Sequence, residues 1–298
     1  MKNYVAYMLT MIGAGFWGLT GLFVDSLYSY GFTAWEIVAI RLTVSSTILL
    51  IVLLLTQPKK LKIQWKHLPH FFGLGVGSIV FFNWCYFTVM QQTSVSIAVV
   101  LLYTAPIFVT ILSRFLFHEP ITRSKIISLS LTVIGCALAI GLFPFGNLSI
   151  PLISIILGIL SAFFCGLYSI IGKQVSRHYN FLTTTVYALL TGSIFILPTS
   201  GLWNKTDSFQ SIEVWLNIAG IAIISTIAAY TLYTLGLAYI ESSKAAILGA
   251  MEPIVAVLVG VIIFDDQLTL FQTFGIILVI SAAFMTVYRK KRKITVKR

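Results

Sequence analysis

Long apolar stretches occupy most of this chain and constrain its fold more than any other feature. An α-helix needs about 20 predominantly apolar residues to cross a hydrocarbon layer about 30 Å thick. Charged residues make up only 10% of the 298 residues, too few to cover a water-soluble surface. The pattern therefore predicts an all-α integral membrane protein and excludes an ordinary cytosolic enzyme. Ten stretches are long enough, at residues 4–24, 35–56, 69–90, 97–117, 124–143, 151–171, 181–198, 214–239, 244–264 and 270–288.

The lysines and arginines gather on one side when the N-terminus is placed in the cytoplasm and the ten helices alternate. Only Lys205 then falls in an outside loop, and only Arg41 falls within a span. This asymmetry is the positive-inside pattern of membrane proteins. It predicts a multi-pass protein with both termini in the cytoplasm, and it explains the formal net charge of +11 without a nucleic-acid partner. The basic tail 289–298 would also attract anionic headgroups of the lipid bilayer.

The two halves of the chain resemble each other at an offset of about 147 residues. In each half a proline, Pro106 or Pro253, interrupts a span. An acidic residue follows 13 residues later, and a threonine, Thr122 or Thr269, comes three residues after that. A threonine at such a position caps the next helix by accepting from a free backbone N–H. Thr269 with Gln272 has the spacing of a capping box.

A looser similarity joins residues 16–19 to residues 164–167, so the repeated unit holds five helices. Because five is odd, the second copy enters the membrane upside down. The sequence thus predicts two inverted five-helix repeats, at residues 1–143 and 144–288, followed by a basic cytoplasmic tail at 289–298.

Inverted repeats with interrupted helices are typical of secondary transporters. Pro106 and Pro253 both fall near the membrane midplane, reached from opposite sides. Each proline frees a backbone carbonyl one turn earlier. In lipid, that is tolerated only where the helix faces protein or a water-filled cavity. The matched placement favours a cavity, and the alternative is a simple packing kink.

The segments Ala98–Pro106 and Ala245–Pro253 resemble the two repeat signatures of the drug/metabolite transporter superfamily, and within it the EamA-type transporters. The Glu119-Pro-Ile-Thr122 end and the Gln272-x-x-Gly275 pattern are also similar. One departure is Asp265-Asp266, where such proteins often carry Gly-Glu. The resemblance implies transport of small metabolites, often outward, through a central cavity built by both halves. It does not supply one substrate.

Two ionisable residues are predicted at membrane depth, where such groups are expensive and usually functional. Glu252 immediately precedes Pro253, and its counterpart in the first half is Ala105. Removed from water, this carboxylate would take up a proton near neutral pH, bind a substrate amine, or hold the broken backbone. Arg41 would meet a substrate carboxylate, extend toward the outer surface, or pair with Glu36.

Aromatic and polar residues supply the remaining candidates for substrate binding. They follow helical spacing on the predicted spans, and together they would line a cavity with apolar walls and a few hydrogen-bonding groups. Taken singly, each also fits helix packing or an interfacial anchor. These candidates are Trp17, Asn83, Tyr86, Tyr103, Tyr168, Tyr230 and Tyr233.

The sequence as a whole predicts a secondary transporter of small organic solutes that works by alternating access. Amino acids or related metabolites, exported across a bacterial plasma membrane, are the first expectation, and this rests mainly on the resemblance. One alternative is proton-coupled efflux of lipophilic cations. Another, from a different class, is a membrane enzyme acting on lipid-linked substrates. No P-loop, metal-ligand or catalytic motif is found, so no cofactor, metal or catalytic residue is predicted. The oligomeric state is left open.

Overall fold

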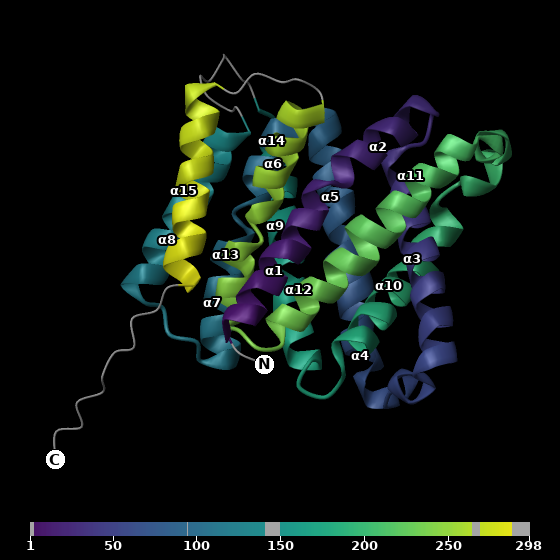
Figure 1. Ribbon diagram of the computed structural model, residues 1–298, viewed down its shortest axis with the longest axis horizontal. Coiled ribbons are helices and arrows are strands. Elements are labelled where there is room, and N and C mark those ends of the chain that lie inside the picture. The colour runs from purple at the N-terminus through teal and green to yellow at the C-terminus, as the bar shows by residue number, and fades with distance from the viewer. Residues whose placement is uncertain (1–2, 94, 141–149, 264–268, 288–298) are drawn as a thin grey trace.

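The computed structural model describes residues 3–93, 95–140, 150–263 and 269–287, and these form a bundle of helices without a strand (Figure 1). The first half contains α1 (Asn3–Gly18), α2 (Thr20–Ser29), α3 (Ala34–Thr56), α4 (Leu68–Phe72), α5 (Phe81–Gln92), α6 (Val95–Leu102), α7 (Ala105–Phe117) and α8 (Arg123–Ala139). The second half contains α9 (Leu152–Val175), α10 (Phe181–Ile196), α11 (Ile212–Ala222), α12 (Ala229–Leu237), α13 (Ser242–Leu248), α14 (Met251–Ile263) and α15 (Leu270–Val287).

Nine helical stretches of the described residues are long and apolar enough to cross a membrane. They match nine of the ten predicted spans and confirm an all-α membrane fold. The tenth span, predicted at 124–143, corresponds to α8, which has 17 described residues and is followed by residues outside the description. The count of ten therefore stays a prediction, and the basic tail at 289–298 also lies outside the described residues.

The helix contacts between the two halves are symmetric. Each contact pairs a helix of one half with a helix of the other, and replacing both helices by their repeat equivalents gives another observed contact. Helix α1 packs on α12, and its equivalent α9 packs on α5. Helix α3 packs on its own equivalent α10, and α8 packs on its own equivalent α15. This is the contact pattern that two repeats related by a two-fold axis produce. The described chain begins and ends at the same end of the bundle (Figure 1).

A π-helical segment lies in the third span of each half. Gly73–Val80 precedes α5, and Ile223–Ala228 precedes α12. A π-helix leaves its carbonyls poorly matched to the regular hydrogen-bond pattern, and such segments often occur at functional sites. Side chains compensate here. The Asn83 amide donates to the Ile79 carbonyl at 2.6 Å, and the Thr226 hydroxyl donates to the Ile221 carbonyl at 2.7 Å.

Side-chain caps fix the helix ends that the sequence marks. The Thr122 hydroxyl accepts from the Lys125 backbone N–H at 3.3 Å, which confirms the predicted cap of α8. Thr269 and Gln272 bond reciprocally, at 2.9 and 3.2 Å, and form the predicted capping box of α15. Each cap contributes about 1 kcal/mol to the stability of its helix.

Glycines let several helix pairs approach closely, as small residues do in membrane proteins. On α15, a Cβ atom added to Gly275 would lie 2.3 Å from the Ala139 nitrogen and 2.6 Å from the Gly135 carbonyl oxygen of α8. On α1, a Cβ atom at Gly18 would lie 2.4 Å from the Glu252 carbonyl oxygen. Both helix pairs can approach this closely only because glycine has no side chain.

We expect Gly275→Ala to destabilise the protein by about 1–3 kcal/mol, because overpacking forces two helix backbones apart. Gly77→Ala is the matched control, since no heavy atom lies within 4 Å of the added Cβ. The measurement is the temperature at which half of the monodisperse protein is lost in detergent. Equal midpoints for the two variants would contradict the close approach of α8 and α15.

Candidate functional site

The fourth span of each half is interrupted in the middle of the bundle. Helix α6 ends at Leu102 and α7 begins at Ala105, with Pro106 in its first turn. Helix α13 ends at Leu248 and α14 begins at Met251, with Pro253 in its first turn. The proline lacks an N–H, so it is tolerated only at such a helix start. The two breaks bring irregular backbone from both halves to the same depth.

A cavity of about 920 Å³ lies between the halves and borders both breaks. This volume falls in the range of about 300–1,000 Å³ found for small-molecule sites. The cavity continues along α2, from Thr20 to Tyr28, and along Val259–Val261 of α14. It therefore extends toward the end of the bundle where α14 ends. Its lining includes every predicted substrate-binding or charge candidate and both helix-breaking prolines: Trp17, Arg41, Asn83, Tyr86, Tyr103, Pro106, Tyr168, Tyr230, Tyr233, Glu252 and Pro253.

Aromatic rings from three helices form one wall of this cavity. The Trp17 ring lies 5.0 Å from the Tyr230 ring and 4.9 Å from the Tyr233 ring, measured between centroids. The Tyr168 ring lies 5.1 Å from the Tyr230 ring in an edge-on arrangement. Such contacts add about 0.5–1.5 kcal/mol per pair beyond burial. The Trp17 indole nitrogen is buried and has no hydrogen-bond partner within the described part of the chain.

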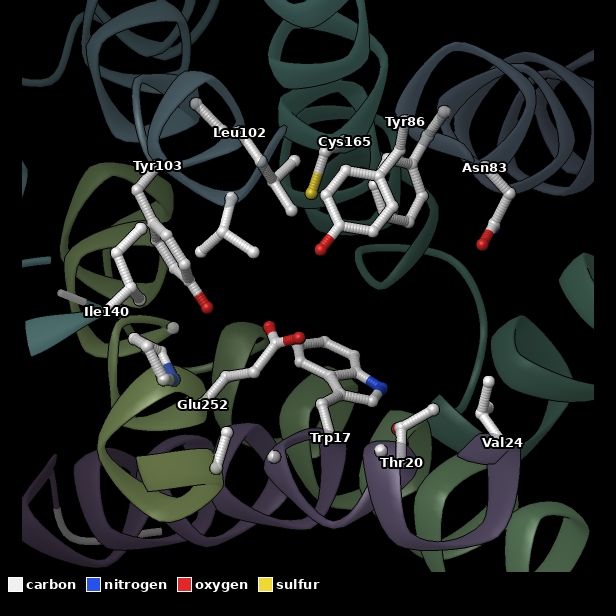
Figure 2. Close-up of a pocket in the computed structure, with 18 of the residues that line it drawn as sticks. Trp17, Thr20, Val24, Asn83, Tyr86, Leu102, Tyr103, Ile140, Cys165 and Glu252 are labelled. Carbon is white, nitrogen blue, oxygen red and sulfur yellow. The ribbon is translucent and has the colours of Figure 1, made fainter. Parts of the chain in front are cut away.

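Glu252 projects from the start of α14 into the cavity, opposite Tyr103 (Figure 2). The Tyr103 hydroxyl faces the Glu252 carboxylate across this space (Figure 2). Tyr103 comes from the last turn before the break in the first half, and Glu252 from the first turn after the break in the second. The two interrupted helices thus present one carboxylate and one hydroxyl to the same space.

Arg41 faces the cavity from α3, and the exposed Asp25 of α2 also borders it. The Arg41 Nε atom is buried and lacks a hydrogen-bond partner among the residues described. Glu36, which the sequence offers as a possible ion-pair partner of Arg41, instead forms the capping box of α3 with Thr33. The ion pairs in the described ranges include neither Arg41 nor Glu252. Opposite charges thus face one cavity without a salt bridge.

Sequence reasoning missed several residues of the wall, including Thr20, Phe82 and Cys165. The signal for two of them was present in the similarity between residues 16–19 and 164–167. At that offset of 148, Cys165 corresponds to Trp17, and Thr20 corresponds to Tyr168. Both members of each pair line the cavity. Among the described residues no group of His, Cys, Asp and Glu is arranged to hold a metal ion.

Comparison with known proteins agrees with this architecture. The profile of the EamA-like transporter family matches residues 5–141 and matches again at residues 152–288. The chain belongs to the EamA-like transporter family. The double match covers both halves of the chain, and the cavity of this EamA-like protein lies between the two matched segments.

Relatives of this EamA-like protein extend over nearly its whole length. A protein of Archaeoglobus fulgidus, named an uncharacterized transporter, is 29% identical over 97% of this chain and 100% of its own. The uncharacterized transporter YyaM of Bacillus subtilis is 25% identical, over 94% and 92% of the two chains. A solved crystal structure superposes with a TM-score of 0.79 at 15% identity, over 94% of this chain and 95% of the other. That likeness shows a shared fold.

The native cysteines offer a direct test of the cavity. The Cys165 sulfur points into it (Figure 2), whereas the side chains of Cys85 and Cys136 are fully buried. We expect a small, charged methanethiosulfonate reagent to modify one cysteine per chain in the folded protein. Mass spectrometry of peptides would locate the modification at Cys165, and Cys165→Ser would abolish it. Modification of Cys85 or Cys136 at an equal rate would contradict the described cavity.

Proposed function

We propose that this EamA-like protein is a secondary transporter that moves small zwitterionic metabolites, amino acids first among them, by alternating access. The observation that carries this proposal is the unpaired arrangement of Glu252 and Arg41 on one cavity wall. An ionised group inside a membrane protein is expensive unless something compensates its charge. A solute that carries both an ammonium and a carboxylate would compensate both residues at once.

The wall chemistry supports a small organic solute with a partly apolar body. Trp17, Tyr86 and Tyr103 surround the carboxylate end of the cavity with rings, and Met90 and Val99 add aliphatic surface. The few polar groups would orient the solute, and the apolar wall would take its side chain. The Glu252 carboxylate would bind the solute's ammonium, and the Arg41 guanidinium would bind its carboxylate in a bidentate manner.

We propose the membrane orientation from the sequence pattern and the direction of transport from the family resemblance. The positive-inside distribution of basic residues supports both termini in the cytoplasm of a bacterial cell with the chain in its plasma membrane. The cavity then extends toward the outside, which is the state in which an exporter releases its solute. Export remains our first expectation because the family resemblance favours it.

A second candidate function is efflux of lipophilic cations coupled to protons. The aromatic wall beside Glu252 favours it, because ring faces attract cations. In that mechanism the Glu252 carboxylate would bind either a proton or the cation, and Arg41 would have no partner on the solute. The role of Arg41 therefore separates the two candidates.

We expect amino acids to stabilise the detergent-purified protein more than matched compounds that lack one charge. The panel sets each amino acid beside its decarboxylated amine and its deaminated acid, with tetraphenylphosphonium as the lipophilic cation. A ligand at 100 times its dissociation constant adds about 2.7 kcal/mol to the stability of the folded form. The readout is the thermal midpoint, followed by counterflow of the stabilising compound in proteoliposomes.

Two substitutions assign the charges. Arg41→Gln should weaken amino-acid binding at least tenfold, because hydrogen bonds to charged groups are worth about 1.5–3 kcal/mol, and should leave binding of the amine unchanged. Glu252→Gln should weaken binding of the amino acid and of the amine, and should leave binding of the deaminated acid unchanged. Stabilisation by tetraphenylphosphonium alone, unaffected by Arg41→Gln and lost in Glu252→Gln, would replace the amino-acid proposal with cation efflux.

A further inference from the structure

A cluster of buried charges joins the two halves at the end of the bundle where α1, α8 and α13 begin, which we call the N-terminal face (Figure 1). The residues Glu119, Lys125 and Lys244 are only 7–8% exposed there, although all three are ionisable. We call this cluster the latch. It consists of Glu119 and Lys125 from the first half and Glu241, Ser242, Ser243 and Lys244 from the second.

Glu119 forms the central link of the latch. It lies just beyond the end of α7, where His118 takes a left-handed conformation and turns the chain inward. One carboxylate oxygen of Glu119 accepts from the Ser242 backbone N–H at 2.8 Å. The other accepts from the Ser243 N–H at 3.3 Å and from the Ser243 hydroxyl at 2.6 Å. An acid of the first half therefore caps the N-terminus of α13 in the second half.

The two lysines of the latch balance its two acids. Lys125 of α8 lies 2.6 Å from a Glu241 oxygen and 3.5 Å from a Glu119 oxygen. Lys244 of α13 lies 3.5 Å from Glu241 and donates to the Tyr7 hydroxyl of α1 at 3.1 Å. A buried network of this kind is stable only when each charge is compensated. Separating the halves at this face would break all of these contacts.

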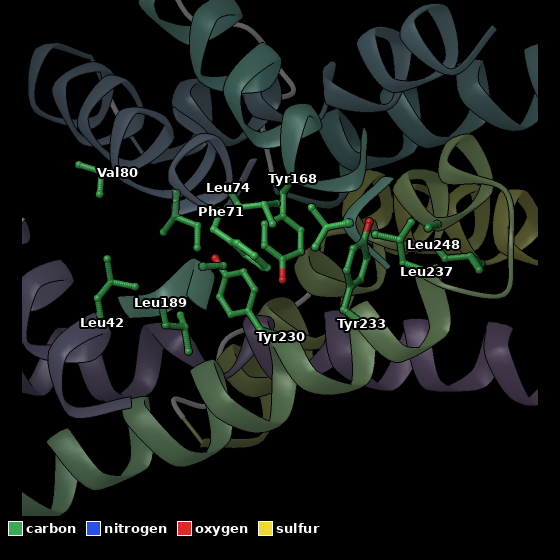
Figure 3. Close-up of a cluster of buried hydrophobic side chains, with 14 of the residues drawn as sticks. Leu42, Phe71, Leu74, Val80, Tyr168, Leu189, Tyr230, Tyr233, Leu237 and Leu248 are labelled. Carbon is green, nitrogen blue, oxygen red and sulfur yellow. The ribbon is translucent and has the colours of Figure 1, made fainter. Parts of the chain in front are cut away.

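A packed layer from α9, α12 and α13 borders the cavity. Tyr168, Tyr233, Leu237 and Leu248 form part of the largest buried cluster, which Figure 3 shows. Hydrogen bonds tie this layer together across α9 and α12, from Tyr168 to Thr234 at 2.7 Å and from Ser169 to Tyr233 at 2.8 Å. None of the six latch residues lines the cavity, whose lining extends the other way, along α2 and the last turns of α14.

The latch breaks the symmetry of the repeat. At the offset of 147, Glu119 corresponds to Asp266, but Lys125, Glu241 and Lys244 correspond to Gln272, Ser94 and Ile97. Three of the four charges thus have no charged counterpart in the other half. The sequence therefore does not repeat all four latch charges at the corresponding positions of the other half.

We propose that the latch is the gate of the N-terminal face, and that release of α13 from Glu119 opens this face during transport. The inference rests on the proposed alternating-access function. Helix α13 is a short segment, joined to α14 through the break at Gly249 and Ala250. The break lets α13 move without α14, so loss of its cap frees the closing element and leaves the Glu252 site intact.

The test uses Cys165 as a reporter of access in the full chain, with no substrate present. Right-side-out and inside-out membrane vesicles are exposed to a membrane-impermeant methanethiosulfonate. In the wild type we expect Cys165 to react fast from one side and slowly from the other. Ser243→Ala should raise the slow-side rate about tenfold, since it removes one hydrogen bond to a charged group. Glu119→Gln should raise it further.

Glu213→Gln is the matched control. Glu213 is an acid at the start of α11 that also accepts a hydrogen bond from a first-half residue, the Tyr30 hydroxyl, but at the opposite face. We expect it to leave the slow-side rate unchanged, and Cys165→Ser to remove the signal. Should Glu119→Gln fail to fold, Ser243→Ala carries the test, because it removes a single hydroxyl.

An unchanged slow-side rate in folded Ser243→Ala would overturn the latch, as would equal reactivity of wild-type Cys165 from both sides. Failure of the proposed transport function would give a different result from failure of the latch. If wild-type proteoliposomes show no counterflow while the latch variants still raise slow-side labelling, the transport proposal fails and the gate of the N-terminal face stands.

Discussion

Lipid offers no hydrogen bonds, so every backbone N–H and C=O at membrane depth must be satisfied inside the protein. Unbroken helices meet this constraint by themselves, whereas the two interrupted helices do not. At the first break the Thr104 hydroxyl donates to the Leu101 carbonyl at 2.6 Å. At the second, the Glu252 N–H donates to the Gly249 carbonyl at 3.1 Å. The remaining backbone groups at the two breaks need a cavity in which polar partners can reach them. The breaks are therefore tolerated only because they border the cavity.

Most of the fold is predictable because the apolar stretches and helix caps are local signals. The caps at Thr122 and Thr269 depend on residues three positions away, and both form as expected. The π-helical segments are different. Gly73–Val80 contains three glycines, but the matching Ile223–Ala228 contains none and no proline. Packing between the halves, which no short motif records, selects this geometry.

The candidate site is predictable where chemistry at membrane depth is unusual, as at Glu252 and Arg41. Residues of ordinary type are harder to recognise, because a Cys165 or a Thr20 in an apolar helix fits packing equally well. Alignment of the two halves recovers both of these. The latch could not be recovered in this way. Glu119 marks a helix end in the sequence, and only the packing of the halves brings it to α13.

A symmetric scaffold with symmetric side chains would have no reason to favour one access state over the other. Two inverted halves exchange roles between the states, so identical residues would give both states equal energy. Glu252 stands where the first half has Ala105, and three of the four latch charges stand where the other half has an uncharged residue. In the proposed mechanism the repeat therefore supplies the two access states. We propose that the residues departing from the repeat decide which state is lower in energy and which solute the cavity binds.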